Sequence, residues 1–129
     1  MVHTEMELGM SKKWLIIAGI SGFLGVGLGA FGAHGLKNTL NAEMIEIFKT
    51  GVLYHLIHSV VLLALALAAG STFEISKWFF LAGIVLFSFS LYLYAVTGTL
   101  FFAVITPFGG VCFLTAWLSL IITAVKKVP

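Results

Sequence analysis

Four long apolar runs constrain this chain more than any other feature of its sequence. They cover roughly residues 14–33, 52–69, 78–96 and 108–125, and none has an aspartate, glutamate, lysine or arginine in its interior. Each is close to the roughly 20 residues that an α-helix needs to cross a bilayer. Only 9% of the 129 residues are charged, whereas soluble domains have about 25%. The sequence therefore predicts one all-α domain over residues 1–129, a four-helix transmembrane bundle embedded in the lipid bilayer.

The first run begins like a signal peptide, because two lysines precede it and Gly32-Ala33 resembles a cleavage site. It is, however, longer than the roughly 7–15 apolar residues of a signal-peptide core. Small residues at helical spacing let helices approach closely in lipid. Four glycines of this run have that spacing, namely Gly22, Gly25, Gly29 and Gly32. We therefore expect the run to be retained and these glycines to be helix-packing residues.

Lysines are divided unequally between the two ends of such a bundle. Four spans leave both termini on one side, together with the connection between the second and third spans. Lys37 and Lys49 lie on the opposite side. The side of the termini holds the other five, Lys12, Lys13, Lys77, Lys126 and Lys127. Because lysine-rich connections stay in the cytoplasm, both termini are predicted to be cytoplasmic.

The connection between the first two spans contains a segment with helical periodicity. Apolar or small residues from Met44 to Gly51 recur at i, i+3, i+4 and i+7, whereas Glu43 and Glu46 fall on another face. Such a pattern is typical of an amphipathic helix that lies in the membrane interface. A short interfacial helix over Leu40–Thr50 is therefore predicted between spans one and two.

The connection between the last two spans, residues 97–107, contains no charged residue. Thr106-Pro107 is typical of an N-cap followed by proline at the first helical position, so the fourth span is expected to begin there. The apolar run Phe101–Ile105 is expected to dip into the interface or to pack on the bundle, because unpaired backbone groups are not tolerated in lipid.

Histidines are the side chains that most suggest a ligand site. His55 and His58 share one face of the second span, and His34 lies at the end of the first. An antiparallel hairpin would place the three imidazoles at similar depth, where they would be candidate ligands for zinc, copper or haem. The alternative is a structural role, with each imidazole hydrogen-bonded to a hydroxyl or backbone group. This second interpretation is favoured, so no cofactor is assigned.

Other classes of function find no support in the sequence. Arginine, the usual residue for phosphate and nucleic-acid recognition, is absent, so nucleic-acid binding is not expected. The single cysteine, Cys112, excludes an intrachain disulfide. The sequence has no aspartate, no phosphate-binding loop and no Gly-x-Ser-x-Gly motif. An enzyme is therefore not expected.

Several local patterns together resemble a known family. They are Gly-Ala-Phe-Gly-Ala-His-Gly-Leu at residues 29–36, Tyr54-His55 with His58, and Ile-Thr-Pro-Phe-Gly-Gly at residues 105–110. From about Lys12 onward the chain resembles the YgdD/YwdK-like family of small membrane proteins, whereas residues 1–10 fall outside the pattern. The resemblance implies a four-helix protein of the bacterial cytoplasmic membrane, and it implies no activity.

The function expected from these features is that of a small, non-enzymatic, multi-pass membrane protein. Its expected interactions are with the lipid bilayer and with either a second copy of itself or a larger membrane complex, as a structural or accessory subunit. The alternative is a metal-binding, haem-binding or small-solute transport component that uses His34, His55 and His58.

Overall fold

The computed structural model describes residues 9–68 and 70–129, and these form an all-helical bundle. Residues 1–8, which include most of the segment outside the family pattern, and Ala69, the expected end of span two, lie outside the described residues. The elements are α2 (Lys12–His34), α3 (Ala42–Ala68), α4 (Glu74–Gly83), the π-helix η1 (Ile84–Phe89), α5 (Ser90–Thr97) and α6 (Leu100–Lys127).

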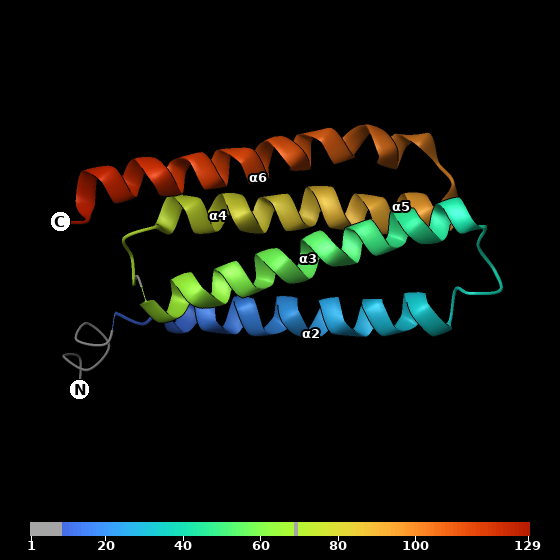
Figure 1. Ribbon diagram of the computed structural model, residues 1–129, viewed down its shortest axis with the longest axis horizontal. Helices are drawn as coiled ribbons and strands as arrows, with labels where there is room; N and C mark the ends of the chain where they lie inside the picture. The colour runs from blue at the N-terminus through green and yellow to red at the C-terminus, as the bar shows by residue number, and fades with distance from the viewer. Residues whose placement is uncertain (1–8, 69) are drawn as a thin grey trace.

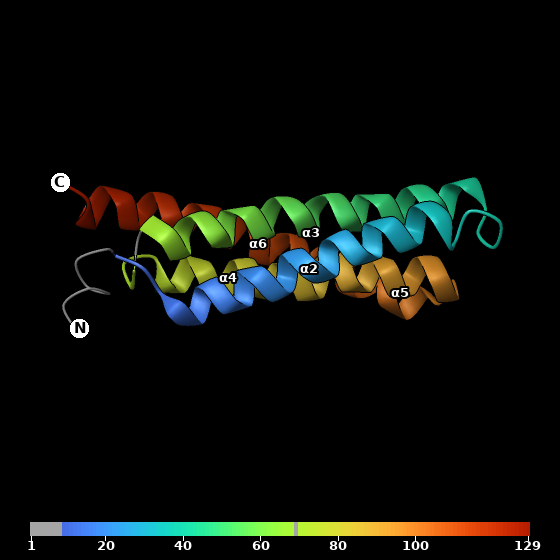
Figure 2. The ribbon, with the colours of Figure 1, turned by 90° about the horizontal axis from the view of Figure 1, so that it is seen from below.

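The predicted four-span architecture is confirmed, because four helical segments are long and apolar enough to cross a membrane. Three are the single helices α2, α3 and α6, and the other is α4, η1 and α5 in one continuous run, Glu74–Thr97. The spans lie side by side along one long axis, and α2 begins at the same end of the bundle where α6 finishes (Figures 1 and 2). Span α2 packs mainly on α3, whereas α6 packs on α4, η1 and α5.

The buried core is divided into two clusters along the axis of the bundle. The larger one contains eight buried residues, Trp14, Ala18, Leu62, Ala66, Phe80, Ile84, Phe113 and Ala116. The smaller one lies towards the other end and contains Leu36, Phe48, Tyr92 and Ala95. Large apolar side chains such as Phe23 (79% exposed) and Leu114 (71% exposed) cover the outer surface. An apolar surface of this kind is solvated by hydrocarbon rather than by water.

The segment predicted as a short interfacial helix is helical, and it leads without a break into span two as the beginning of α3. One helix runs from Ala42 to Ala68, and the Asn41 side chain accepts a hydrogen bond from the Met44 backbone N–H at 2.9 Å. Gly51 lies inside this helix, where a Cβ would be 2.8 Å from the Tyr92 ring and 3.2 Å from the Ser88 carbonyl oxygen, so glycine lets α3 approach α5 and η1 closely. That the first turns of α3 lie in the membrane interface remains a prediction.

The predicted start of the fourth span at Thr106-Pro107 is wrong. Helix α5 ends at Thr97 and is capped by Gly98, whose left-handed φ of +68° reverses the chain, and α6 begins at Leu100. Pro107 therefore lies inside α6, where it removes one backbone hydrogen bond. Thr106 does not cap a helix, because its hydroxyl donates to the Phe102 carbonyl oxygen at 3.3 Å. The apolar residues Phe101–Ile105 belong to the first turns of α6. Their helical conformation lets the backbone N–H and C=O groups bond to each other, as the lipid surroundings require.

Candidate functional site

The three candidate histidines lie at different places in the bundle. His34 is exposed at the end of α2, whereas the side chains of His55 and His58 are buried within α3. A Cβ added to Gly25 would be 3.5 Å from the His55 ring. His34 is nine residues further along α2, which places it about 13 Å from that level along the helix axis. The expectation of similar depth is wrong, because α3 begins as early as Ala42 and His55 falls near its middle.

The structure therefore does not bring His34, His55 and His58 together as one set of ligands. No group of three or more His, Cys, Asp or Glu side chains among residues 9–68 and 70–129 is placed to hold a metal ion. Instead, each buried imidazole has hydrogen-bond partners at both ring nitrogens. The structural interpretation of these two histidines therefore has direct support from their contacts.

His55 is the centre of a hydrogen-bond chain that joins three spans. Its Nδ1 lies 2.9 Å from the Tyr92 hydroxyl on α5, and its Nε2 lies 3.2 Å from Ser21 Oγ on α2. Ser21 Oγ is 2.6 Å from Ser59 Oγ, and the Ser59 hydroxyl donates to the His55 carbonyl oxygen at 2.7 Å. All four side chains are buried. The chain ties α2, α3 and α5 together through polar groups that would otherwise be unpaired in an apolar interior.

The last bond of this chain fixes the direction of the others. A hydroxyl has one proton, and Ser59 uses its proton on the His55 carbonyl, so Ser21 must donate to Ser59. Ser21 then accepts from His55 Nε2–H, so the contacts place a proton on Nε2. Neutral imidazole is the form that the bundle interior tolerates best. In that form Nδ1 accepts from the Tyr92 hydroxyl.

We expect replacement of His55 to show whether this chain contributes to stability. His55→Leu leaves the Tyr92 and Ser21 hydroxyls without their partner, at a cost of about 1–2 kcal/mol for two hydrogen bonds between membrane helices. His55→Gln offers an amide donor and acceptor, and should recover more than half of that loss. The measurement is the free energy of unfolding by SDS titration in detergent micelles. Equal losses for the two variants would contradict a hydrogen-bonding role for His55.

His58 has the opposite tautomer. Its Nδ1 lies 2.7 Å from the Tyr54 carbonyl oxygen, which can only accept, and its Nε2 accepts from the Trp117 indole N–H at 3.3 Å. Its ring also stacks on Phe113, with centroids 3.8 Å apart and an angle of 13° between the planes. These contacts join α3 to α6 through aromatic side chains, in a region where the two backbones stay apart.

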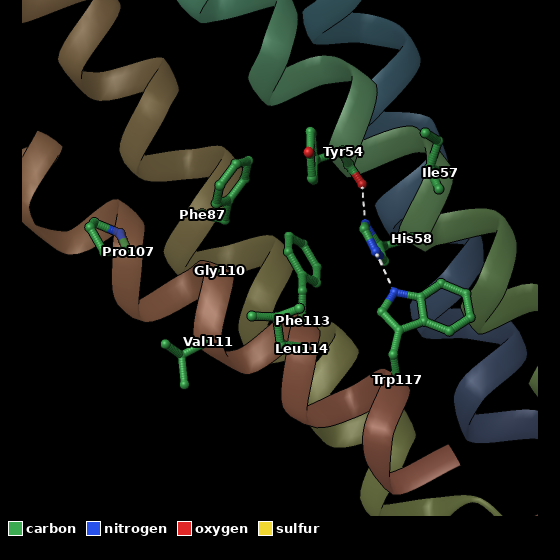
Figure 3. Close-up of a pocket in the computed structure, with 10 residues that line it drawn as sticks. All are labelled: Tyr54, Ile57, His58, Phe87, Pro107, Gly110, Val111, Phe113, Leu114 and Trp117. Atoms are coloured by element: carbon green, nitrogen blue, oxygen red, sulfur yellow. Dashed lines mark hydrogen bonds between the residues drawn. The ribbon is translucent and has the colours of Figure 1, made fainter. Parts of the chain in front are cut away.

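The space between these two helices is a groove of about 600 Å³. Its walls include Tyr54, His58, Phe87, Phe113 and Trp117, with Gly110 on the α6 side, and we call it the α3–α6 groove. Figure 3 shows the His58 and Phe113 side chains next to each other and the hydrogen bonds of His58 to the Tyr54 carbonyl and to Trp117. Volumes of this size are typical of sites for small molecules.

A second polar cluster lies at the end of the bundle where α2 begins. The Glu74 carboxylate accepts from the Trp14 indole at 3.0 Å and pairs with Lys13 at 2.7 Å and with Lys77 at 3.4 Å. The Lys77 side chain is fully buried and donates to the Gly70 carbonyl oxygen. A buried ammonium group needs such partners. This cluster therefore holds the start of α2 against the start of α4.

Comparison with known proteins shows which family the chain belongs to. Residues 28–110 match a family model described as a protein of unknown function (DUF423). The UPF0382 membrane protein YwdK of Bacillus subtilis is 41% identical over 120 residues, which cover 89% of this chain and 98% of that relative. The chain belongs to this family. The UPF0382 inner membrane protein YgdD of Escherichia coli is 43% identical to this DUF423 protein over 122 residues, covering 90% and 92% of the two chains.

The family membership confirms the resemblance that the sequence motifs indicated. Together with the four spans, it identifies this DUF423 protein as a multi-pass membrane protein. No solved structure matches the chain.

Sequence reasoning missed most partners of the histidines in this DUF423 protein. Ser59 lies four residues after His55, so the shared helix face was visible in the sequence, and the Ser59 hydroxyl bonds the His55 carbonyl. Ser21, in contrast, is a single polar residue of a glycine-rich run, and nothing local links it to α3. Tyr54 resembles a residue of an interfacial belt, yet it lies near the middle of α3 and lines the groove.

Proposed function

We propose that this protein is a non-enzymatic accessory subunit that packs against a further transmembrane helix through one outer face of α2. The observation that carries the proposal is a division among the glycines of this helix. At Gly25, Gly29 and Gly32 an added Cβ would come within 2.6–3.2 Å of an α3 side-chain atom. These three glycines support the predicted role in close packing of α2 on α3.

A second set of α2 glycines does not pack against another helix of the described residues. At Gly19, Gly22 and Gly27 an added Cβ would meet nothing within 4 Å among the described residues. Gly22 was expected with the packing glycines, yet here its Cα faces away from α3. Glycine inside a helix costs about 0.5–1 kcal/mol relative to alanine. Packing within this chain does not offset that cost at these positions.

The open glycines form part of a face of small residues. Gly19, Gly22, Val26 and Ala30 recur at i, i+3, i+7 and i+11, so they share one side of α2. Gly19, Val26 and Ala30 are exposed and Gly22 is half-buried, so most of this face is accessible. Small residues at this spacing are typical of helix–helix interfaces in membranes. A second copy of the chain, or another subunit of a membrane complex, would fit this face.

Cross-linking in membranes tests the proposal. In a Cys112→Ser background, Gly22→Cys should form a disulfide with a partner helix, whereas Gly27→Cys, equally open but on another side of α2, should not. A second copy would give a homodimer on a non-reducing gel, and another subunit would give a heavier adduct identified by mass spectrometry. Equal cross-linking at both positions, or none at Gly22→Cys, would contradict the proposal.

We further propose that the protein lies in the cytoplasmic membrane with both termini inside. The lysine distribution supports this orientation, and α2 begins at the same end of the bundle where α6 finishes (Figure 1). Alkaline phosphatase fused to the C-terminus should be inactive, and green fluorescent protein fused there should fluoresce. A fusion after Asn38, in the opposite connection, should give the reverse pattern. Active phosphatase at the C-terminus would show that the orientation is inverted.

A further inference from the structure

We infer that the α3–α6 groove binds a neutral, lipid-soluble compound with a flat ring and a hydrogen-bond acceptor, the chemistry of alkyl quinones. Four features of the groove carry this inference: its place in the bundle, its aromatic walls, its lack of charge and one hydroxyl group. None of them depends on the proposed packing face of α2, which lies on another helix.

The groove is placed where a compound dissolved in the bilayer has access to it. Its outer residues are exposed, with Tyr54 at 39% and Val111 at 60%, whereas His58 and Phe113 at its floor are 5% and 4% exposed. Tyr54 lies twelve residues after Ala42 in a helix of 27 residues. Helices of this length span about 40 Å, so the groove faces the hydrocarbon rather than the headgroups.

Five of the ten residues that line the groove have aromatic rings. The Tyr54 and Phe87 rings have centroids 4.6 Å apart at an angle of 38°, and His58 and Phe113 are stacked at 3.8 Å. Figure 3 shows these side chains together with Trp117 around the groove. Ring–ring contacts contribute beyond the area they bury. An acyl chain has no ring and makes no such contacts. It also gains little from the apolar groove, because the bilayer that it leaves is equally apolar.

The groove contains no charged side chain. Its one ionisable floor residue, His58, is held neutral, because its Nδ1–H donates to a carbonyl and its Nε2 accepts from Trp117. An anionic or cationic ligand would therefore be taken out of water without a counter-charge, which is costly. A neutral ligand matches this electrostatic environment.

One hydrogen-bond donor in the groove is free. The backbone carbonyl of Tyr54 pairs with His58, but the Tyr54 hydroxyl has no partner within residues 9–68 and 70–129. In hydrocarbon, a hydroxyl without an acceptor is unfavourable. A ring carbonyl placed against the aromatic wall would supply the acceptor. This donor favours a quinone over a hydrocarbon ligand of the same size.

The test uses the full chain in phosphatidylcholine nanodiscs, titrated with decyl-benzoquinone, with quenching of tryptophan fluorescence as the readout. Binding at the groove should give a saturable component, because Trp117 lies in the wall. Gly110→Leu should abolish this component: Gly110 lines the groove and a Cβ there meets only Phe87, at 4.0 Å, so the leucine side chain would occupy space that the ligand needs. Tyr54→Phe should weaken binding about 5- to 10-fold through loss of one hydrogen bond.

Gly27→Leu is the matched control, because Gly27 is equally open but lies on α2. It should retain saturable quenching, and near-native unfolding of both leucine variants would confirm that they fold. Linear, unsaturable quenching of the wild-type protein would overturn the inference, as would saturation that persists in Gly110→Leu. Native mass spectrometry adds a further outcome. A phospholipid retained by the wild type, lost in Gly110→Leu and not displaced by the quinone would show that an acyl chain is the occupant.

Discussion

Gly109→Ala is expected to destabilise the bundle by about 1–3 kcal/mol, the usual cost of overpacking. The added Cβ would lie 2.6 Å from both the Leu86 carbonyl carbon and the Phe87 Cα of η1. These are backbone atoms, so no side chain can rotate to make room. Helix α6 must then move away from η1, and the packing of Phe113 in the core is disturbed with it. Unfolding by SDS titration would measure the loss.

Gly110→Ala is the control for this prediction, because it makes the same chemical change one residue later. A Cβ at Gly110 meets only Phe87 Cδ2, at 4.0 Å. This variant should be neutral or more stable by about 0.5–1 kcal/mol, the gain in helix propensity from glycine to alanine. If both variants unfold like the wild type, α6 does not approach η1 as closely as the structure indicates.

Glu74→Gln is expected to cost about 2–3 kcal/mol, somewhat less than the removal of one partner from a fully buried ion pair. The Glu74 carboxylate faces Lys77, whose side chain is fully buried, and it also pairs with Lys13. The glutamine amide keeps an acceptor for the Trp14 indole but carries no charge. Within residues 9–68 and 70–129, the Lys77 ammonium group then keeps the Gly70 carbonyl and the Trp14 ring, 5.7 Å away, but it loses its one carboxylate partner.

A second glutamate–lysine pair with the same i, i+3 spacing provides the comparison. Lys49 and Glu46 are 3.0 Å apart, closer than Lys77 and Glu74, but their side chains are 61% and 71% exposed. Exposed pairs of this kind contribute about 0.2–0.5 kcal/mol. Glu46→Gln should therefore change the free energy of unfolding very little. Equal losses for the two variants would show that burial of Lys77 does not matter.

Number, length and approximate position of the spans were predictable from composition and run length alone. Because hydrocarbon supplies no hydrogen-bond partners, each apolar run must form a helix to pair its own backbone N–H and C=O groups. Four spans can therefore be predicted without knowledge of the contacts between them. The same rule makes Phe101–Ile105 helical, and it was the proline at position 107 that misled the prediction of where α6 begins. Proline predicts a helix start from the local sequence alone. Helix α6 nevertheless continues through Pro107, because the loss of one backbone hydrogen bond leaves those of the neighbouring turns in place.

What only the tertiary structure decided is which residues meet between spans. Four glycines at helical spacing indicate a packing face on α2, but the spacing does not show that one of them, Gly22, faces away from α3. Similarly, the sequence places His55 and His58 on one helix, whereas the bundle gives them different partners, Ser21 and Tyr92 for one and Trp117 for the other. The physical reason is that periodicity fixes the angle of a side chain around its own helix. Axial offset and rotation between helices arise from side-chain packing, which no single run of residues contains.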